Sequence, residues 1–237
     1  MAKEEKVYTY QDFLDIIALL RSENGCPWDR EQTHESLRPC MMEEAAEVIS
    51  AIRILEKTGN AENLQEELGD VLLQVVMHAR IAEEEGLFSM EDVVNDVAAK
   101  MVRRHPHVFG DVEASTSDEV LKNWDDIKKQ EKEGKSWIES PLREIPKELP
   151  ALTRAVKVLK KADKLYGRHV DYAQAVAVIK ETAAKLEECK EQEKETVLKN
   201  ELGSLLIAVA DMARLYKLPV EQMLTDQIED MIENYEE

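Results

Sequence analysis

The stretch that decides the fold is residues 67–80, ELGDVLLQVVMHAR, because it recurs in altered form at residues 201–214, ELGSLLIAVADMAR. Seven of the fourteen aligned positions are identical. Such self-similarity at a long period indicates two related units. No segment of the chain shows sustained alternation of apolar and polar residues, which argues against strands. We therefore predict an all-α protein made of tandem helical-bundle repeats.

Helix-start and helix-stop signals divide both halves of the chain. The pairs Thr9-x-x-Asp12 and Ser89-x-x-Asp92 have the spacing of a capping box, as does the pair at residues 116 and 119. Glycines at several predicted ends are typical helix terminators. The expected helices span about residues 10–24, 39–58, 61–86, 90–104, 117–134, 151–166, 173–190, 194–216 and 219–235.

A proline cluster separates the two halves. Pro141, Pro146 and Pro150 fall within ten residues, and prolines this close prevent a continuous helix. We therefore predict an N-terminal domain at residues 1–137, a proline-rich linker at residues 138–150 and a C-terminal domain at residues 151–237.

Composition limits the possible partners. The 237 residues are 43% hydrophobic and 34% charged, with a formal net charge of −19. Such a protein repels polynucleotides and anionic membranes, but it can bind a small anion together with a divalent metal. The first ten residues lack the apolar segment of a signal peptide, and no run reaches the roughly 18 apolar residues of a membrane span. We expect a cytoplasmic protein.

Acidic residues interrupt two apolar helices that are expected to be neighbours. In MMEEAAEVIS, residues 41–50, the side chains of Glu43, Glu44 and Glu47 share a sector of roughly 100°. Glu67 and Asp70 are three residues apart and also share a face. If the two helices pack antiparallel, these carboxylates converge and form an all-oxygen site suited to Mg²⁺, Mn²⁺ or Ca²⁺.

The alternative is a solvated acidic surface, as is common in a glutamate-rich chain. Gly69 favours the convergent arrangement, because a glycine within a helix costs about 1 kcal/mol relative to alanine. We expect this glycine to permit a close approach between helices.

The combined motifs resemble those of a known family. E-E-x-x-E followed by E-x-x-D is similar to the signature of the all-α nucleoside triphosphate pyrophosphohydrolases. The flanking words ENGCPWDREQTHESL, RRHPHVFGD and VLKNWDDIKKQEK resemble the MazG family within that group, over nearly the whole chain. The resemblance implies Mg²⁺-dependent hydrolysis of NTPs or dNTPs to monophosphate and pyrophosphate, with Mn²⁺ as a possible substitute. It also implies a homodimer whose helical bundles are completed between chains.

The resemblance also assigns roles to residues. The implied metal ligands are Glu44, Glu47, Glu67 and Asp70, and the implied catalytic group is Glu43, Glu44 and Glu47, with Glu43 as a further ligand or as the activator of water. The implied substrate contacts are Lys100, Arg103, Arg104, Trp124 and Lys128. Without the resemblance, the arginines could simply interact with a helix dipole, and Trp124 could anchor its helix by packing. His34, His105 and His107 are expected to be structural.

The second copy departs from the pattern. Ser204 occupies the position of Asp70, and Lys180 and Ala184 occupy the positions of the first and third glutamates. Only Glu181 and Glu201 remain, so we predict a catalytically silent C-terminal domain. Two rival functions are a ferritin-like di-metal oxidase, which needs two Glu-x-x-His motifs, and a non-catalytic dimerisation or regulatory module with a vestigial nucleotide site.

Overall fold

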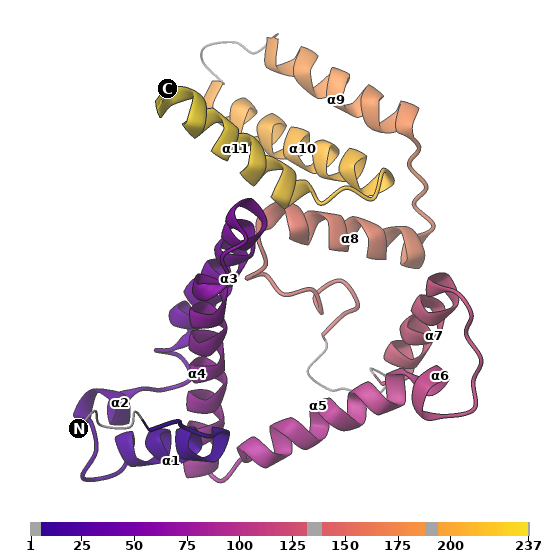
Figure 1. Cartoon of the computed structure of the whole chain (residues 1–237). Helices are drawn as coiled ribbons and strands as arrows, with labels where there is room; N and C mark the ends of the chain where they lie inside the picture. Colours follow the sequence, from indigo (N-terminus) through magenta and orange to yellow (C-terminus); the bar gives the residue numbers. More distant parts are fainter. Residues whose placement is uncertain (1–5, 132–138, 188–193, 237) are drawn as a thin grey trace. The chain divides into compact units, whose positions relative to one another are not determined.

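The computed structural model describes residues 6–131, 139–187 and 194–236, and within these ranges it contains helices and no strand. The predicted all-α fold class is confirmed for these residues (Figure 1). The helices are α1 (Tyr10–Leu20), α2 (Pro27–Glu31), α3 (Arg38–Thr58), α4 (Glu62–Glu84), α5 (Met90–Arg104), α6 (Pro106–Phe109), α7 (Ser117–Gln130), α8 (Ala151–Tyr166), α9 (Tyr172–Glu187), α10 (Lys194–Leu215) and α11 (Val220–Glu236).

The chain forms two compact units, Met1–Glu131 and Lys132–Glu237. The predicted domain boundaries and the linker at residues 138–150 remain predictions. The expected extensions of the fifth helix to residue 134 and of the helix after residue 173 to residue 190 lie outside the described residues. None of the described helices is long and apolar enough to cross a membrane.

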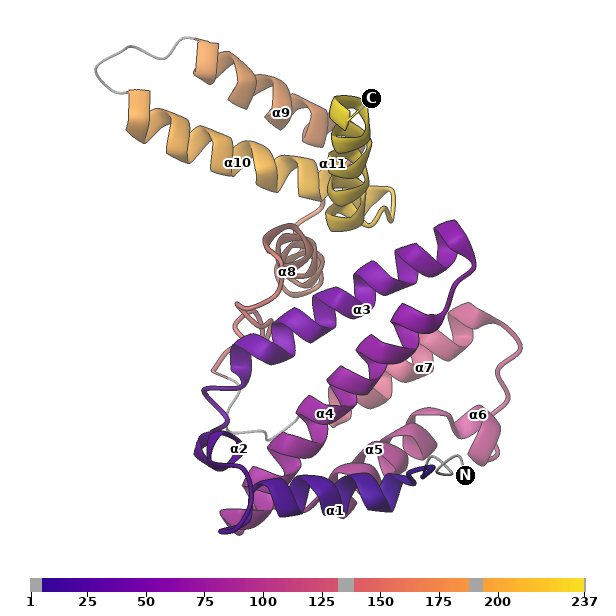
Figure 2. The ribbon, with the colours of Figure 1, turned by 60° about the vertical axis from the view of Figure 1, so that its left-hand side comes forward.

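In the first unit, α3 and α4 form an antiparallel hairpin, and α1 packs across α4 (Figures 1 and 2). The core combines residues of α1 and α4 with the segment before α3. Its buried members are Ile17, Leu37, Val76, Met77 and Ile81. Because this core lies toward the C-terminal half of α4, it anchors the hairpin while leaving the opposite half of α4 available for polar groups.

Local sequence signals set the helix ends. Thr9 and Asp12 form a complete capping box at α1, and Ser89 and Asp92 form another at α5. These predictions are confirmed. Two short helices that the sequence analysis did not predict, α2 and α6, begin at Pro27 and at the proline of residue 106, where the fixed φ of proline suits a first helical position.

One arginine fixes the segment that leads into α3. The side chain of Arg21 is 6% exposed and donates to the Glu84 carboxylate of α4, with a shortest N–O distance of 2.8 Å. Its Nη1 also donates to the carbonyl oxygens of Asp29 at 2.5 Å and Gln32 at 3.2 Å. The position of α3, and therefore of its glutamates, depends on this contact.

The second unit contains α8 to α11. Ala210, Ala213 and Val220 form its small core, against which side chains of α8 pack. Asp211, with a side chain 4% exposed, accepts hydrogen bonds from Arg168 and Arg214. These ion pairs hold the segment after α8 against α10.

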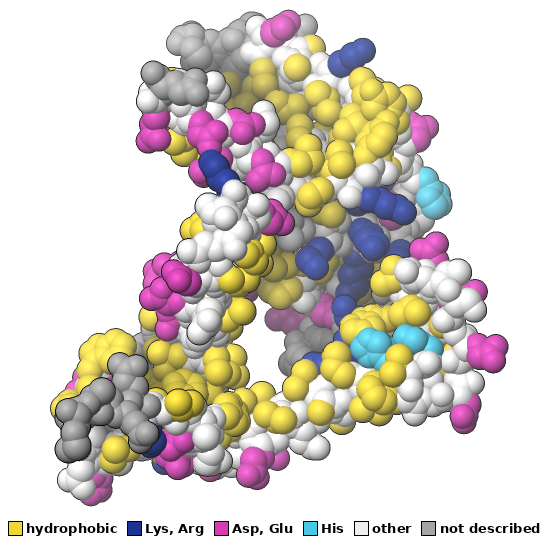
Figure 3. Space-filling view, viewed as in Figure 1, with side chains coloured by type: hydrophobic (Ala, Val, Ile, Leu, Met, Phe, Trp, Pro, Cys, Tyr) yellow, Lys and Arg dark blue, Asp and Glu magenta, His cyan; other side chains and the backbone are white. Residues whose placement is uncertain are grey.

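Large apolar side chains remain exposed on the hairpin of the first unit. They include Ile49 and Ile52 of α3 and Leu68 and Leu72 of α4, between 38% and 52% exposed. Figure 3 shows apolar side chains at the molecular surface. The expectation that Gly69 permits a close helix approach is wrong within this chain, because an added Cβ there would meet no atom within 4 Å.

Candidate functional site

Three carboxylates converge on the α3–α4 hairpin. Glu44 projects from α3, and Glu67 and Asp70 project from adjacent turns of α4. One oxygen of each lies within 4.8 Å of the others, and all three residues are partly buried. The predicted convergence is therefore present for these three residues. Among the described residues, this is the one group with the geometry to hold a metal ion.

The electrostatics of the group are unfavourable when no cation is present. Burial, followed by the charges of Asp70 and Glu47, raises the pKa of the Glu44 carboxyl above its usual value. A hydrogen bond with Glu47 also raises it, so the fourth predicted ligand lies beside the three. Glu43 is exposed and lies outside the convergent group. The cluster therefore favours a bound proton or a bound cation.

Asn63 is a member of the site that the sequence analysis missed. Its side-chain Nδ2 donates to Glu67 Oε1 at 2.7 Å, from one turn earlier on α4. The spacing of four residues between Asn63 and Glu67, in NLQEE, was the available signal. Asn63 fixes the orientation of the Glu67 carboxylate, and a ligand oriented in this way binds metal better than a free one.

The donor set fits a hard divalent cation. All the donors are carboxylate oxygens, which suit Mg²⁺ and Mn²⁺, whereas Zn²⁺ is usually bound with nitrogen or sulfur ligands. Two histidines of this unit contact each other instead: the Nδ1 atoms of His34 and His78 are 2.8 Å apart, so one ring donates a hydrogen bond to the other.

A second cluster lies at the C-terminal end of α5. Arg103 Nε donates to Glu131 Oε1 at 2.8 Å, and Arg104 donates to Glu131 Oε2 from Nε at 3.0 Å and from Nη2 at 2.5 Å. The Arg104 guanidinium lies 5.2 Å from the centre of the Trp124 ring. Three of the predicted substrate contacts are thus neighbours, and Glu131 joins them.

The two remaining predicted substrate contacts are less constrained. Lys100 is partly buried on α5, one turn before Arg104, whereas Lys128 is exposed on α7. Within the first unit, α5 leads away from the hairpin, so its C-terminal end and α7 lie apart from the carboxylates (Figure 1). Among the residues that the structure describes, the members of each cluster lie together, but the two clusters do not join.

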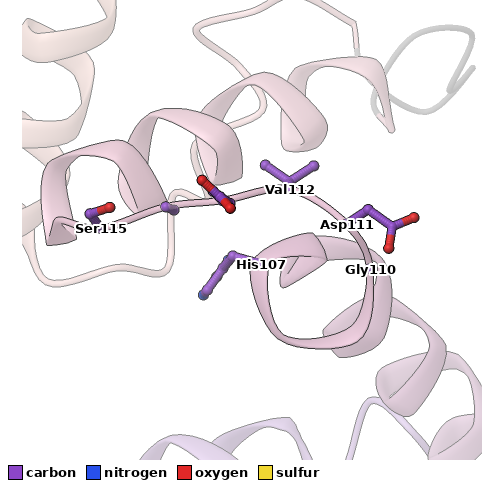
Figure 4. A pocket seen from close by; sticks show the side chains of 7 residues that line it. His107, Gly110, Asp111, Val112 and Ser115 are labelled. Atoms are coloured by element: carbon purple, nitrogen blue, oxygen red, sulfur yellow. The ribbon is translucent and has the colours of Figure 1, made fainter.

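A shallow hollow of about 510 Å³ lies beside the arginine cluster, lined by His107 and by the loop of residues 110–115 (Figure 4). The His105 ring connects the two places: it meets the Trp124 ring edge-on at 5.0 Å and lies 5.6 Å from the His107 ring. The Nδ1 of His107 is buried and has no hydrogen-bond partner among the described residues.

These features define a class: an all-α protein with a carboxylate site for a hard divalent cation and a separate arginine–tryptophan cluster. Comparison with known proteins identifies the family. The pattern of the MazG nucleotide pyrophosphohydrolase domain matches residues 32–109, which include the carboxylates and both arginines. The chain belongs to the MazG nucleotide pyrophosphohydrolase family.

Relatives match over most of the chain. The Thermotoga maritima nucleoside triphosphate pyrophosphohydrolase/pyrophosphatase MazG is 39% identical over 226 residues, which cover 95% of this chain and 84% of that protein. The Escherichia coli K12 nucleoside triphosphate pyrophosphohydrolase is 39% identical over 207 residues, covering 85% of this chain and 76% of that protein. The Bacillus subtilis protein YabN is 44% identical over 226 residues; these are 94% of this chain but only 45% of that relative.

Proposed function

We propose that this chain hydrolyses nucleoside triphosphates, ribo- or deoxyribo-, to the monophosphate and pyrophosphate, and that the reaction takes place at the first unit with Mg²⁺. The observation that carries the proposal is the convergence of Glu44, Glu67 and Asp70 within 4.8 Å of one another. Mutual repulsion makes this arrangement unfavourable unless a cation offsets it. Family membership supports the same reaction class.

Four carboxylates would hold the cation: Glu44, Glu67 and Asp70 directly, with Glu47 beside them. Mg²⁺ bound there would neutralise negative charge that develops on the leaving pyrophosphate, and it would lower the pKa of a coordinated water. Glu43 is exposed on the same helix, one residue before the first ligand, and can accept a proton from the attacking water. We assign Glu43 this role as general base or as a further ligand.

Cationic side chains would bind the phosphates that the metal does not reach. Arg103 and Arg104 present guanidinium groups, whose paired donors match phosphate oxygens. Lys100 and Lys128 would supply further positive charge. Trp124 offers a ring face to the base or the ribose.

We also propose a homodimer in which the second copy covers the open face of the hairpin. Ile49, Ile52, Leu68 and Leu72 are exposed there, and Gly69 lies on that face without a neighbour. A dimer would also allow the arginine cluster of one copy to approach the carboxylates of the other. Light scattering coupled to size exclusion would give a mass near twice 27.1 kDa; a mass of one chain would refute this arrangement.

The tandem-repeat interpretation makes the second unit a structural copy. Its hairpin pairs α9 with α10, and the remaining Glu181 carboxylate forms an ion pair with Lys185 at 2.9 Å. Ser204 cannot replace an anionic ligand. We propose that this unit does not catalyse the reaction.

The experiment is a panel of NTPs and dNTPs incubated with the whole chain, with Mg²⁺ and with a chelator. We expect monophosphate and pyrophosphate in equal amounts, only when the metal is present. Release of diphosphate and inorganic phosphate, or equal rates with chelator, would refute the proposal. Glu44→Gln should abolish turnover, whereas Glu66→Gln, an exposed carboxylate on α4, is the matched control.

A further inference from the structure

Glu131 pairs with both arginines of this cluster. Both of its carboxylate oxygens accept hydrogen bonds from guanidinium groups, one from Arg103 and the other twice from Arg104. The Glu131 side chain is 13% exposed and that of Arg104 is 15% exposed. The guanidinium donors that hold this carboxylate are the same donors that can bind the oxygens of a phosphate.

The contacts of Glu131 differ from those of Glu84, a carboxylate whose arginines have a structural role. Glu84 also accepts hydrogen bonds from two arginines, Arg21 and Arg80. Arg21, however, donates in addition to backbone carbonyl oxygens. In contrast, the Arg103 side chain is 54% exposed and pairs with Glu131 through its Nε. Two cations face one anion, so the cluster keeps an excess positive charge that faces solvent.

We propose that Glu131 is a built-in competitor for the substrate's phosphates. This inference rests on the proposed function. In the empty enzyme, the Glu131 carboxylate holds the guanidinium groups of Arg103 and Arg104 in place; when nucleotide binds, the phosphate oxygens take over these hydrogen bonds and the carboxylate leaves.

The competition has a physical consequence for affinity. A ligand can bind the arginines only after their ion pair with Glu131 has opened. The apparent affinity is therefore the intrinsic affinity multiplied by the fraction of molecules in which this pair is open. A polyphosphate carries several charges and can offset this cost, whereas a singly charged anion cannot. Glu131 is therefore a positioning residue: it allows polyphosphates to bind the two arginines and prevents singly charged anions from doing so.

The first test measures binding of tripolyphosphate by calorimetry in the presence of a chelator, so that neither nucleotide nor metal is required. Glu131→Gln keeps the size of the side chain and removes its charge. We expect affinity to rise about tenfold or more, the range expected when a hydrogen bond to a charged group no longer competes. The KM for NTP should fall in the same variant. Unchanged or weaker tripolyphosphate binding by a folded Glu131→Gln protein would overturn the proposal.

Glu84→Gln is the matched control, because it also removes a carboxylate that accepts from two arginines. It should lower thermal stability without tightening tripolyphosphate binding. Equal tightening in this control would overturn the proposal, since it would show a general charge effect.

A second measurement needs no variant. The amide of Glu131 donates to the Ile127 carbonyl oxygen at 3.0 Å and closes the last turn of α7. If tripolyphosphate displaces the Glu131 side chain, amide exchange in this turn should accelerate on binding; slower exchange would mean that Glu131 stays in place and would refute the displacement. If the whole chain releases no pyrophosphate from any NTP, the proposed function fails, and that outcome is independent of both binding results.

Discussion

Replacing Asp70 by asparagine should stabilise the metal-free protein. Its carboxylate oxygen lies within 4.8 Å of oxygens of Glu44 and Glu67. At that separation, two unit charges in water repel by about 0.9 kcal/mol, so two pairs give about 2 kcal/mol. Screening at physiological salt, with a Debye length of about 8 Å, reduces this to about 1 kcal/mol. The melting temperature should therefore rise by about 2–4 °C in a chain of this size.

The same substitution should remove the stabilisation by Mg²⁺, because a neutral amide is a weaker ligand for a hard cation. The assay is thermal unfolding of the wild type and Asp70→Asn, each in chelator and in excess Mg²⁺. Glu66→Gln makes the same change in net charge on an exposed part of α4 and should leave the Mg²⁺ effect intact. A lower melting temperature for Asp70→Asn in chelator, or an undiminished response to Mg²⁺, would refute the reasoning.

Three further predictions concern the site and its supports. Because the pKa of Glu44 is raised in the folded state, its own contribution to metal-free stability should be present below about pH 4.5 and be lost as pH rises through the raised pKa. Mg²⁺ affinity should increase over the same window; calorimetric Mg²⁺ titration across pH checks this, and a pH-independent affinity would contradict it. Arg21→Ala should cost about 2 kcal/mol in urea unfolding, because it removes the hydrogen bonds of a buried guanidinium to Glu84 and to two backbone carbonyls while Arg80 still pairs with Glu84, and a loss below about 1 kcal/mol would exclude that role. Glu181→Gln in the second unit should leave the rate of pyrophosphate release unchanged, and a marked fall would mean that this unit takes part in catalysis.

The carboxylate cluster could be predicted because it depends on local periodicity. Glu67 and Asp70 share a face in any α-helix, and Glu44 meets them once the next helix returns antiparallel. The capping boxes at Thr9 and Ser89 were predictable for the same reason, since each is complete within four residues.

Features that depend on long-range choices were not predictable. Nothing in the sequence distinguishes Glu131 from its acidic neighbours, and its contact with Arg104 spans 27 residues. The role expected for Gly69 was wrong because the sequence shows that close approach is possible but not which surface faces the glycine. Asn63 could have been found from its spacing to Glu67, but an amide at that spacing is common on solvated helices.

The most direct test of the central claim is a titration with Mn²⁺, followed by the relaxation of solvent protons and competed with Mg²⁺. The wild type and Glu66→Gln should bind Mn²⁺ saturably and release it to Mg²⁺, whereas Asp70→Asn should lose both the binding and the release of pyrophosphate from NTP. Full Mn²⁺ binding together with full turnover in Asp70→Asn would contradict the assignment of the converging carboxylates as the metal site.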